Sequence, residues 1–180
     1  MKGARDQLLA AAVHVIGEHG IGGLTNRRVC AAAGVSPGSL TYHFATQNDL
    51  IREAVTTFVA EESDRIRAIV EELRGSVTSV EEAALAAQRA IEAIALGSAE
   101  IGVFEVYLQA ARDPELRSCA RDCYAAYDGA AREILGALAL ESTDERAAHV
   151  VAFISGSQLR RLATGVDDGT FADGLLRLIS

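Results

Sequence analysis

Apolar residues recur every three or four positions along most of the chain, and β-branched runs that alternate with period two are missing. This spacing is typical of amphipathic α-helices that bury one face. A long helix is predicted from about residue 46 to 75, with the apolar stripe Ile51, Val55, Phe58, Val59, Ile66, Ile69 and Leu73. A first helix is predicted to end at Gly20, with the stripe Leu8, Leu9, Ala12, Val15 and Ile16. The pattern therefore predicts an all-α fold.

Capping residues and helix breakers set the bounds of the other helices. Thr46 with Asp49 three residues later resembles a capping box at the start of the long helix. Thr25 is expected to cap a short second helix that Gly34 ends. Later helices are predicted over about 78–97, 99–112, 114–140 and 143–165, and from about residue 170. The sequence thus predicts about nine helices joined by short loops.

The second and third helices have the spacing of a helix-turn-helix. Ser36 is expected to cap the third helix, with Pro37 in its first position and His43 near its end, and Phe44 is expected to pack between this helix and the next. The inward positions are Val29, Ala33, Val35 and Leu40. The outward positions are Ser36, Pro37, Gly38, Ser39, Thr41, Tyr42 and His43. Small leading residues let such a helix enter the major groove of DNA, while the rings at its end reach the backbone.

The net charge of the chain is −8, but the charges are unevenly distributed. The first 58 residues carry five basic and four acidic side chains, whereas the other 122 carry twelve basic and twenty-one acidic ones. Because an acidic body repels a polyanion, nucleic acid is expected to bind only at the N-terminal end. The acidic body also argues against an architectural DNA protein. With no run of about eighteen uncharged apolar residues and no signal-peptide pattern, we expect a cytoplasmic protein without membrane spans.

The stretch "GLTNRRVCAAAGVSPGSLTYHFATQNDL" resembles the N-terminal domain of the tetracycline-repressor (TetR) family of bacterial regulators. The Tyr–His–Phe ending before a capped long helix is more specific than a general helix-turn-helix pattern. The resemblance implies a homodimeric repressor that binds a double-stranded DNA operator through residues 1–46. Residues 47–180 would bind a small inducer and form the dimer, and the helix at about 47–74 would link the two domains. The residues expected at the DNA are Thr25, Arg27, Arg28, Ser36, Pro37, Gly38, Ser39, Thr41, Tyr42, His43 and Gln47.

Three positions depart from the usual pattern of the family. Thr41 stands where an aromatic is usual and could read a base edge, and Cys30 stands where alanine is usual. Gln47 stands where many members place lysine, so a phosphate contact there would lose its charge but could keep a hydrogen bond. Of Arg27 and Arg28, one is expected to touch phosphate, and the sequence does not say which.

Aromatic residues indicate a ligand site in the C-terminal part. An alanine-rich core with a few tyrosines leaves room and hydroxyl groups for a largely apolar effector, although such rings also commonly fill a core. The candidate ligand-binding residues are Phe58, Phe104, Tyr107, Leu108, Tyr124 and Tyr127. For dimerisation we favour the helices at about 115–139 and 143–165, paired as a four-helix bundle across a two-fold axis. The interface residues would be Ser155, Gly156 and Leu159, unless these pack inside one subunit.

Other chemistries receive less support. Cys119 and Cys123 lie four residues apart and could form a metal or redox site with His149, but no fourth ligand accompanies them. Buried thiols commonly behave as small hydrophobes, so no metal or cofactor is expected, and a sensing role for the two thiols stays open. No nucleophile elbow, phosphate loop or zinc-binding His pair occurs, so no enzyme is expected. The alternatives to a ligand-released repressor are a helical dimer that binds DNA without a ligand and an adaptor that has lost specific DNA binding.

Overall fold

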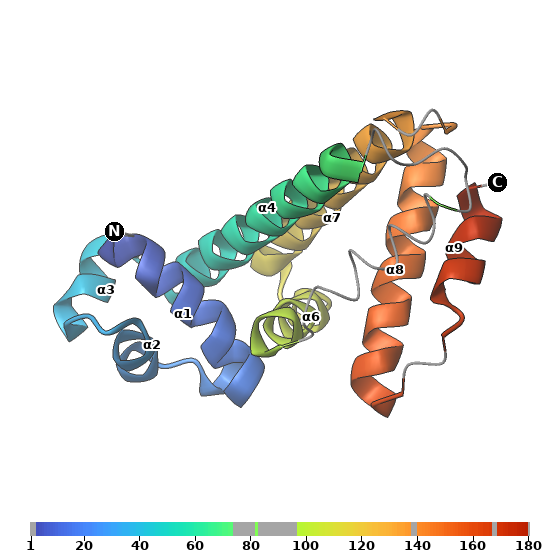
Figure 1. Cartoon of the computed structure of the whole chain (residues 1–180). Coiled ribbons are helices and arrows are strands. Elements are labelled where there is room, and N and C mark those ends of the chain that lie inside the picture. The colour runs from blue at the N-terminus through green and yellow to red at the C-terminus, as the bar shows by residue number, and fades with distance from the viewer. Residues whose placement is uncertain (1–2, 74–81, 83–96, 138–139, 167–168, 180) are drawn as a thin grey trace. The chain divides into compact units, whose positions relative to one another are not determined.

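The computed structural model describes residues 3–73, 82, 97–137, 140–166 and 169–179, and these form eight α-helices and one 3₁₀ helix (Figure 1). In chain order the helices are α1 (Ala4–His19), η1 (Ile21–Gly23), α2 (Asn26–Ala33), α3 (Pro37–His43), α4 (Gln47–Leu73), α6 (Ser98–Ala110), α7 (Pro114–Ala137), α8 (Asp144–Thr164) and α9 (Phe171–Ile179). The predicted all-α fold is confirmed. The helix expected over about 78–97 lies outside the described residues, apart from Glu82.

Most predicted helix ends hold, and the end of α6 shows why one moved. We expected this helix to reach residue 112, but it ends at Ala110. The backbone N–H groups of Arg112 and Asp113 both donate to the Gln109 carbonyl, at 2.8 and 2.9 Å, so the chain turns before Pro114. The residue before a proline is sterically disfavoured in the α conformation. The Asp113 carboxylate then accepts a 3.0 Å hydrogen bond from the Glu115 N–H in the first turn of α7.

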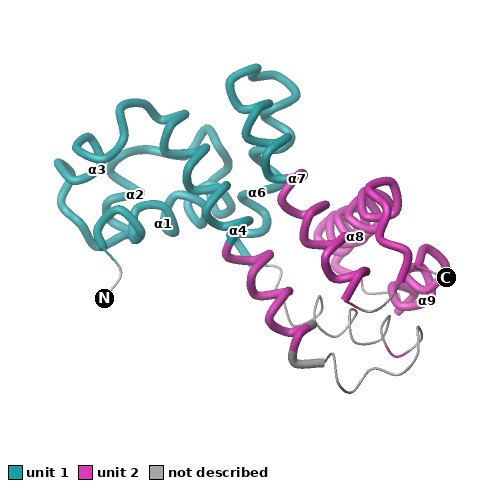
Figure 2. Tube along the Cα trace, turned by 90° about the horizontal axis from the view of Figure 1, so that it is seen from above, with its two compact units in different colours: residues 1–60, 96–123 teal, residues 61–95, 124–180 magenta. Residues whose placement is uncertain are grey.

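The chain divides into two compact units that do not follow the order of the sequence (Figure 2). Unit 1 contains residues 1–60 and 96–123, and unit 2 contains residues 61–95 and 124–180. Helices α4 and α7 therefore pass through both units. Whether residues 1–46 fold as a domain of their own stays a prediction.

Helix α1 forms the centre of unit 1. Its predicted stripe is buried: Leu8, Leu9, Ala12, Val15 and Ile16 are all at most 3% exposed. The backbones of α1 and α6 are in direct contact. A Cβ atom added at Gly17 of α1 would lie 1.5 Å from the Ser98 carbonyl oxygen of α6, and one added at Gly102 of α6 would lie 2.3 Å from the Val13 carbonyl oxygen of α1. Ser98 also hydrogen-bonds the ring of His14 at 2.8 Å. Residues from the later part of the chain thus complete the core around α1.

The start of α4 is held by the predicted capping box. The Asp49 N–H donates to the Thr46 hydroxyl oxygen at 3.0 Å, and the Thr46 N–H donates to the Asp49 carboxylate at 3.1 Å. Hydrogen bonds from Thr46, and then from Arg52, lower the pKa of the Asp49 carboxyl. Reciprocal bonds of this kind satisfy backbone donors that have no partner inside the helix.

Unit 2 has its own core between α7, α8 and α9. Leu135, Val150, Leu175 and Ile179 are buried together, and the rings of Phe153 and Phe171 pack beside them with centroids 5.3 Å apart. Thr143 caps α8 as predicted, by accepting from the Arg146 N–H at 3.2 Å, and the helix ends at Gly165 in the left-handed conformation. No helix in the described part of the chain is long and apolar enough to cross a membrane.

Candidate nucleic-acid interface

The turn between α2 and α3 is fixed by backbone and capping bonds. The Thr25 hydroxyl accepts from the Arg28 N–H at 3.3 Å and so caps α2 as predicted. After α2, Gly34 takes a φ of +66°, which costs a residue with a Cβ atom more than glycine. The Val35 N–H then donates to the Cys30 carbonyl at 3.0 Å, as in a Schellman helix end. These bonds determine the direction in which α3 leaves the turn.

The inward side of α2 and α3 largely matches the prediction. Val29 and Leu40 are at most 4% exposed, whereas Ala33 and Val35 are only half-buried. Cys30, where alanine is usual, is also buried and was missing from the predicted inward set.

Phe44 is 4% exposed, which agrees with its expected packing role. The Arg5 guanidinium lies over its ring, 5.8 Å from the centroid, and also forms an ion pair with Glu53 of α4. Phe44 is therefore contacted by Arg5 of α1, a residue outside its own segment of the chain.

The outward side of α3 is open to solvent. Ser36, Pro37, Gly38, Thr41 and Tyr42 are exposed, and Ser39 and His43 are partly exposed. Tyr42 is 84% exposed, and its ring meets that of His43 edge to face with centroids 5.0 Å apart. A ring that is packed on one neighbour and otherwise solvated is placed for a surface contact rather than for the core.

One hydroxyl group at the start of this helix is used differently from our expectation, and another is bonded within the helix. Ser36 occupies the cap position, but its side chain does not cap the helix, because its hydroxyl hydrogen-bonds that of Ser39 at 3.1 Å. The Thr41 hydroxyl donates to the Gly38 carbonyl at 3.2 Å, which leaves its lone pairs and its methyl group for another molecule.

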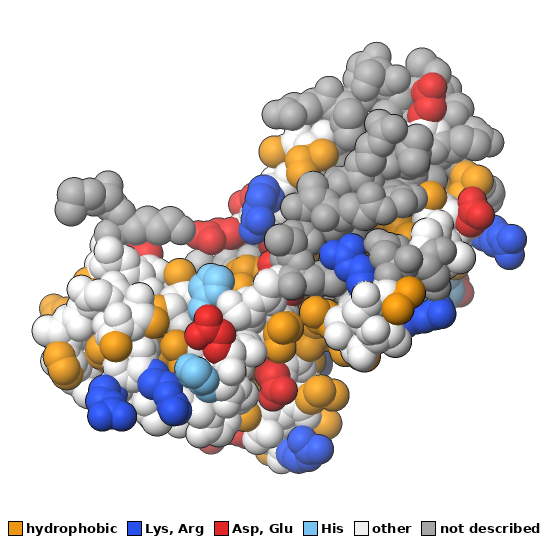
Figure 3. Space-filling model, turned by 60° about the horizontal axis from the view of Figure 1, so that its bottom comes forward, with side chains coloured by type: hydrophobic (Ala, Val, Ile, Leu, Met, Phe, Trp, Pro, Cys, Tyr) orange, Lys and Arg blue, Asp and Glu red, His pale blue; other side chains and the backbone are white. Residues whose placement is uncertain are grey.

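The polar residues around α3 also differ in how they are held. The Arg28 guanidinium donates to the Gly23 carbonyl at 2.8 Å. Arg27 is exposed and makes no hydrogen bond or ion pair with any described residue. The Gln47 amide donates to the Leu24 carbonyl at 2.6 Å, which fixes the first residue of α4 against the segment before α2. On the face shown in Figure 3, basic side chains of the described residues stand singly or in pairs among polar and apolar ones.

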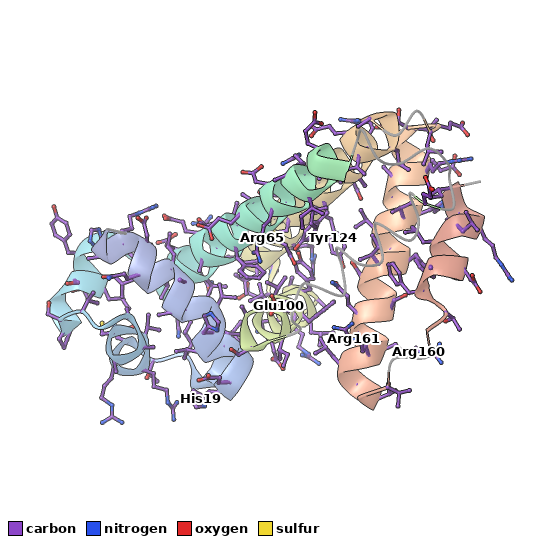
Figure 4. The ribbon with its side chains drawn as sticks, in the orientation of Figure 1. His19, Arg65, Glu100, Tyr124, Arg160 and Arg161 are labelled. Atoms are coloured by element: carbon purple, nitrogen blue, oxygen red, sulfur yellow. The ribbon has the colours of Figure 1, made fainter. Side chains whose placement is uncertain are left out.

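The candidate ligand-binding residues fall into both units. In unit 1 the rings of Phe104 and Tyr107 on α6 meet edge to face, 6.4 Å apart, Phe58 on α4 is half-buried, and Leu108 is 60% exposed. In unit 2 Tyr124 and Tyr127 lie on α7, and Figure 4 labels the first of them. The ligand-binding role of all six stays a prediction.

A buried carboxylate in unit 2 was missed by the sequence analysis. Glu62 on α4 is 5% exposed and accepts a hydrogen bond from the Tyr127 hydroxyl. The signal was present, because position 62 lies four residues from both Phe58 and Ile66 on the apolar stripe. The next residue, Ser63, is 1% exposed, and its hydroxyl has no hydrogen-bond partner among the described residues.

The predicted dimer residues on α8 are not equivalent. Burial raises the pKa of the Tyr124 hydroxyl on α7, and the Ser155 hydroxyl lowers it by a smaller amount, so Ser155 lies near α7 of its own subunit. Gly156 is exposed, and a Cβ atom there would meet nothing within 4 Å. Leu159 is 45% exposed. A Cβ atom at Gly129 of α7 would likewise meet no described residue within 4 Å.

Comparisons with known proteins agree with this architecture. The family model described as "Bacterial regulatory proteins, tetR family" matches residues 8–54, and that described as "Tetracyclin repressor-like, C-terminal domain" matches residues 78–180. A TetR-family member from Streptomyces coelicolor A3 is 31% identical, with 99% of both chains covered and a TM-score of 0.75.

The multidrug binding protein EbrR, solved in complex with ethidium, is 30% identical, with 99% of both chains covered and a TM-score of 0.73. The same protein in complex with malachite green is 32% identical, with 98% of both chains covered and a TM-score of 0.69. Comparison with curated protein sequences gives no match. The two family models together span most of the chain, and the protein therefore belongs to the tetR family of bacterial transcriptional regulators.

Proposed function

We propose that this regulator is a repressor that binds a pseudo-palindromic operator as a homodimer and is released by a small, largely apolar effector. The observation that supports this function best is α4, a single helix of 27 residues. It begins at Gln47, which is bonded to the segment before α2, and continues past the buried Glu62 of unit 2. One continuous helix thus connects the DNA-reading helices with the part of the chain where we place the effector.

The exposed face of α3 supports operator binding. Ser36, Gly38 and Ser39 are small enough to let the start of the helix approach base edges, and Tyr42 can donate to a phosphate. The first test is binding to the DNA upstream of the protein's own gene against scrambled DNA of equal length at moderate salt. We expect a preference of at least about 1000-fold, the lower bound for specific regulators. Equal, weak binding of both DNAs would favour the adaptor instead.

Two variants separate contacts to the backbone from contacts to the bases. Tyr42→Phe should weaken binding to every sequence by about 1 kcal/mol, because one hydrogen bond to phosphate is lost. Thr41→Val removes the hydroxyl and keeps a methyl group, whereas Thr41→Ser removes the methyl group and keeps the hydroxyl. The variant that alters base preference at one operator position has therefore lost the group that reads the base. Uniform weakening by both Thr41 variants would assign this residue to the backbone.

Open space at two helix glycines supports a dimer interface on α7 and α8. A glycine inside a helix costs about 1 kcal/mol relative to alanine, and a Cβ atom at Gly129 or Gly156 would meet no described residue within 4 Å. We propose that these positions let the helices of a second copy approach. Gly156→Trp should convert the dimer to a monomer in analytical ultracentrifugation, whereas Arg177→Trp, at an exposed position of α9, should not.

Glu62 extends the proposed chemistry of the effector. Ethidium and malachite green, which bind EbrR, are aromatic cations, and Glu62 is an acidic side chain that is only 5% exposed. We propose that Glu62 contributes to effector binding, and that an aromatic effector with a positive charge is preferred over a neutral one of the same size. Ethidium fluorescence titrations of the wild type and Glu62→Gln test this, and equal affinities would remove Glu62 from the site.

Effector and operator are proposed to oppose each other through α4. Two recognition helices fit successive major grooves only when they lie about 34–36 Å apart, so a tilt of α4 changes this separation. Linkage requires that DNA weaken effector binding by the same factor by which the effector weakens DNA binding. Operator affinity should be measured with and without a ligand found by thermal-shift screening. A ligand that binds and leaves operator affinity unchanged would contradict the mechanism.

A further inference from the structure

Two thiols lie side by side inside unit 1. Cys119 and Cys123 are one helical turn apart on α7 and are 3% and 1% exposed. Their surroundings are more polar than an ordinary apolar core. The Thr56 hydroxyl of α4 lies 3.8 Å from the Cys119 sulfur, and the Tyr107 hydroxyl of α6 lies beside Cys123.

The spacing of the two cysteines allows both sulfur atoms to bond to one ion. Side chains four residues apart lie above each other on the same face of an α-helix, so the two thiols are neighbours on α7. The thiolate is the form of cysteine that binds metals, so each sulfur exchanges its proton for a bond to the ion.

We propose that Cys119 and Cys123 form a two-thiolate site for a soft, thiophilic metal or metalloid ion. Thiolates select soft ions, and two adjacent sulfurs suit species that accept two of them, such as trivalent arsenic bearing one organic group. Among the described residues no third histidine, cysteine or carboxylate joins the pair to make a larger metal site, and His149 lies in unit 2. On binding, each sulfur gives up its proton and forms one bond to the ion, and no oxidation state changes.

The site is connected to the DNA-reading end of unit 1 by α4. The Cys119 thiol lies 3.8 Å from the Arg52 carbonyl and donates its proton to it. Occupation of the site removes this donor and places a negatively polarised sulfur against the carbonyl oxygen. The contact between α7 and the second turn of α4 is then weakened. This consequence for DNA rests on the proposed function, whereas binding of the ion does not.

The experiment uses phenylarsine oxide and the full-length reduced protein. One molecule of the reagent forms two As–S bonds to a pair of thiols and releases one water, which contains the arsenic-bound oxygen and the two thiol protons. Intact mass spectrometry should show a 1:1 adduct that resists excess glutathione, a monothiol, and is removed by dithiothreitol, a dithiol. Cys119→Ser and Cys123→Ser should each lower the apparent affinity by at least about 100-fold, because bidentate attachment is lost. Cys30→Ser, the matched control at the third buried cysteine, should keep the adduct.

Two results would overturn the site. One is the absence of an adduct in wild type after prolonged incubation at a temperature just below its melting point, where the buried thiols are transiently exposed. The other is an adduct of equal glutathione resistance in Cys119→Ser. Operator affinity of the loaded protein is measured separately. Stable loading without weaker operator binding would overturn the coupling through Arg52, and absence of operator binding by the unloaded protein would overturn the proposed function alone.

Discussion

The side-chain amide of Asn48 donates a 2.6 Å hydrogen bond to the carboxylate of Glu115, which connects the first turn of α4 with the first turn of α7. Further along unit 1, Cys119 of α7 lies against Arg52 and Thr56 of α4. In unit 2, Glu62 of α4 bonds Tyr127 of α7, and further along Arg67 bonds Glu133 at 2.7 Å. In each unit the later α7 residue meets the later α4 residue, so the two helices run in parallel.

Exchanging the donor and the acceptor tests the bond between Asn48 and Glu115. Asn48→Asp places two carboxylates together and should destabilise the protein, whereas Asn48→Asp combined with Glu115→Gln restores one donor and one acceptor. We expect the double variant to recover about 1 kcal/mol in urea denaturation relative to the sum of the single variants. Additive single effects would show that the bond contributes nothing to stability.

Arg27 is expected to be the phosphate contact, because Arg28 is already bonded to Gly23. Arg27→Ala should weaken binding to specific and scrambled DNA alike and should reduce the slope of log K against log salt by about 0.9. Arg27→Lys, which keeps the charge, is the control and should keep the slope. A larger change of slope in Arg28→Ala than in Arg27→Ala would reverse the assignment.

The backbone contact between α1 and α6 leaves no room for side chains. Gly17→Ala and Gly102→Ala would each place a methyl group against a carbonyl oxygen of the other helix. We expect losses of about 3 kcal/mol or more in the free energy of unfolding, because the obstructing atoms belong to the backbone. Gly22→Ala, where a Cβ atom meets nothing within 4 Å, should change stability little. Small losses at all three positions would contradict the close approach.

Asp128 of α7 should make stability depend on pH. Partial burial, and then the negative charge of Asp144, raise the pKa of its carboxyl, so the folded state holds the proton more tightly than the unfolded state does. Stability is therefore lost as the pH rises from the unfolded pKa through the folded one. Asp128→Asn should raise the melting temperature at pH 7 and not at pH 3, by an amount equivalent to less than about 1 kcal/mol because solvent screens the charge. Asp122→Asn, exposed on the same helix, controls for the general loss of a negative charge.

A feature could be predicted from the sequence when the residues that form it lie close together along the chain. The caps at Thr25, Thr46 and Thr143 were correct because each bond joins residues three apart, so side-chain chemistry alone decides it. The exposure of the outward α3 residues was predicted for a similar reason, because it depends on the pattern of residues within one short segment. The Ser36 cap failed because another hydroxyl, that of Ser39, lies equally near.

Features that join distant residues could not be predicted. Thr56 and Cys119 are 63 positions apart, and only folding shows that the thiol pair meets a hydroxyl. The choice between Arg27 and Arg28 likewise needed the position of the Gly23 carbonyl. Glu62 is intermediate, because its place on the apolar stripe was visible in the sequence but its partner Tyr127, 65 residues later, was not.

The close approach of α1 and α6 at Gly17 and Gly102 limits which segments can be exchanged between regulators of this kind. A chimaera that takes its operator specificity from residues 1–46 of this protein and its effector specificity from a relative would place a foreign helix against α1. Any side chain larger than hydrogen at the position of Gly102 would separate the two helices, and the graft would lose affinity for every operator rather than acquire a new one. A workable exchange should therefore transfer α6 together with the first three helices.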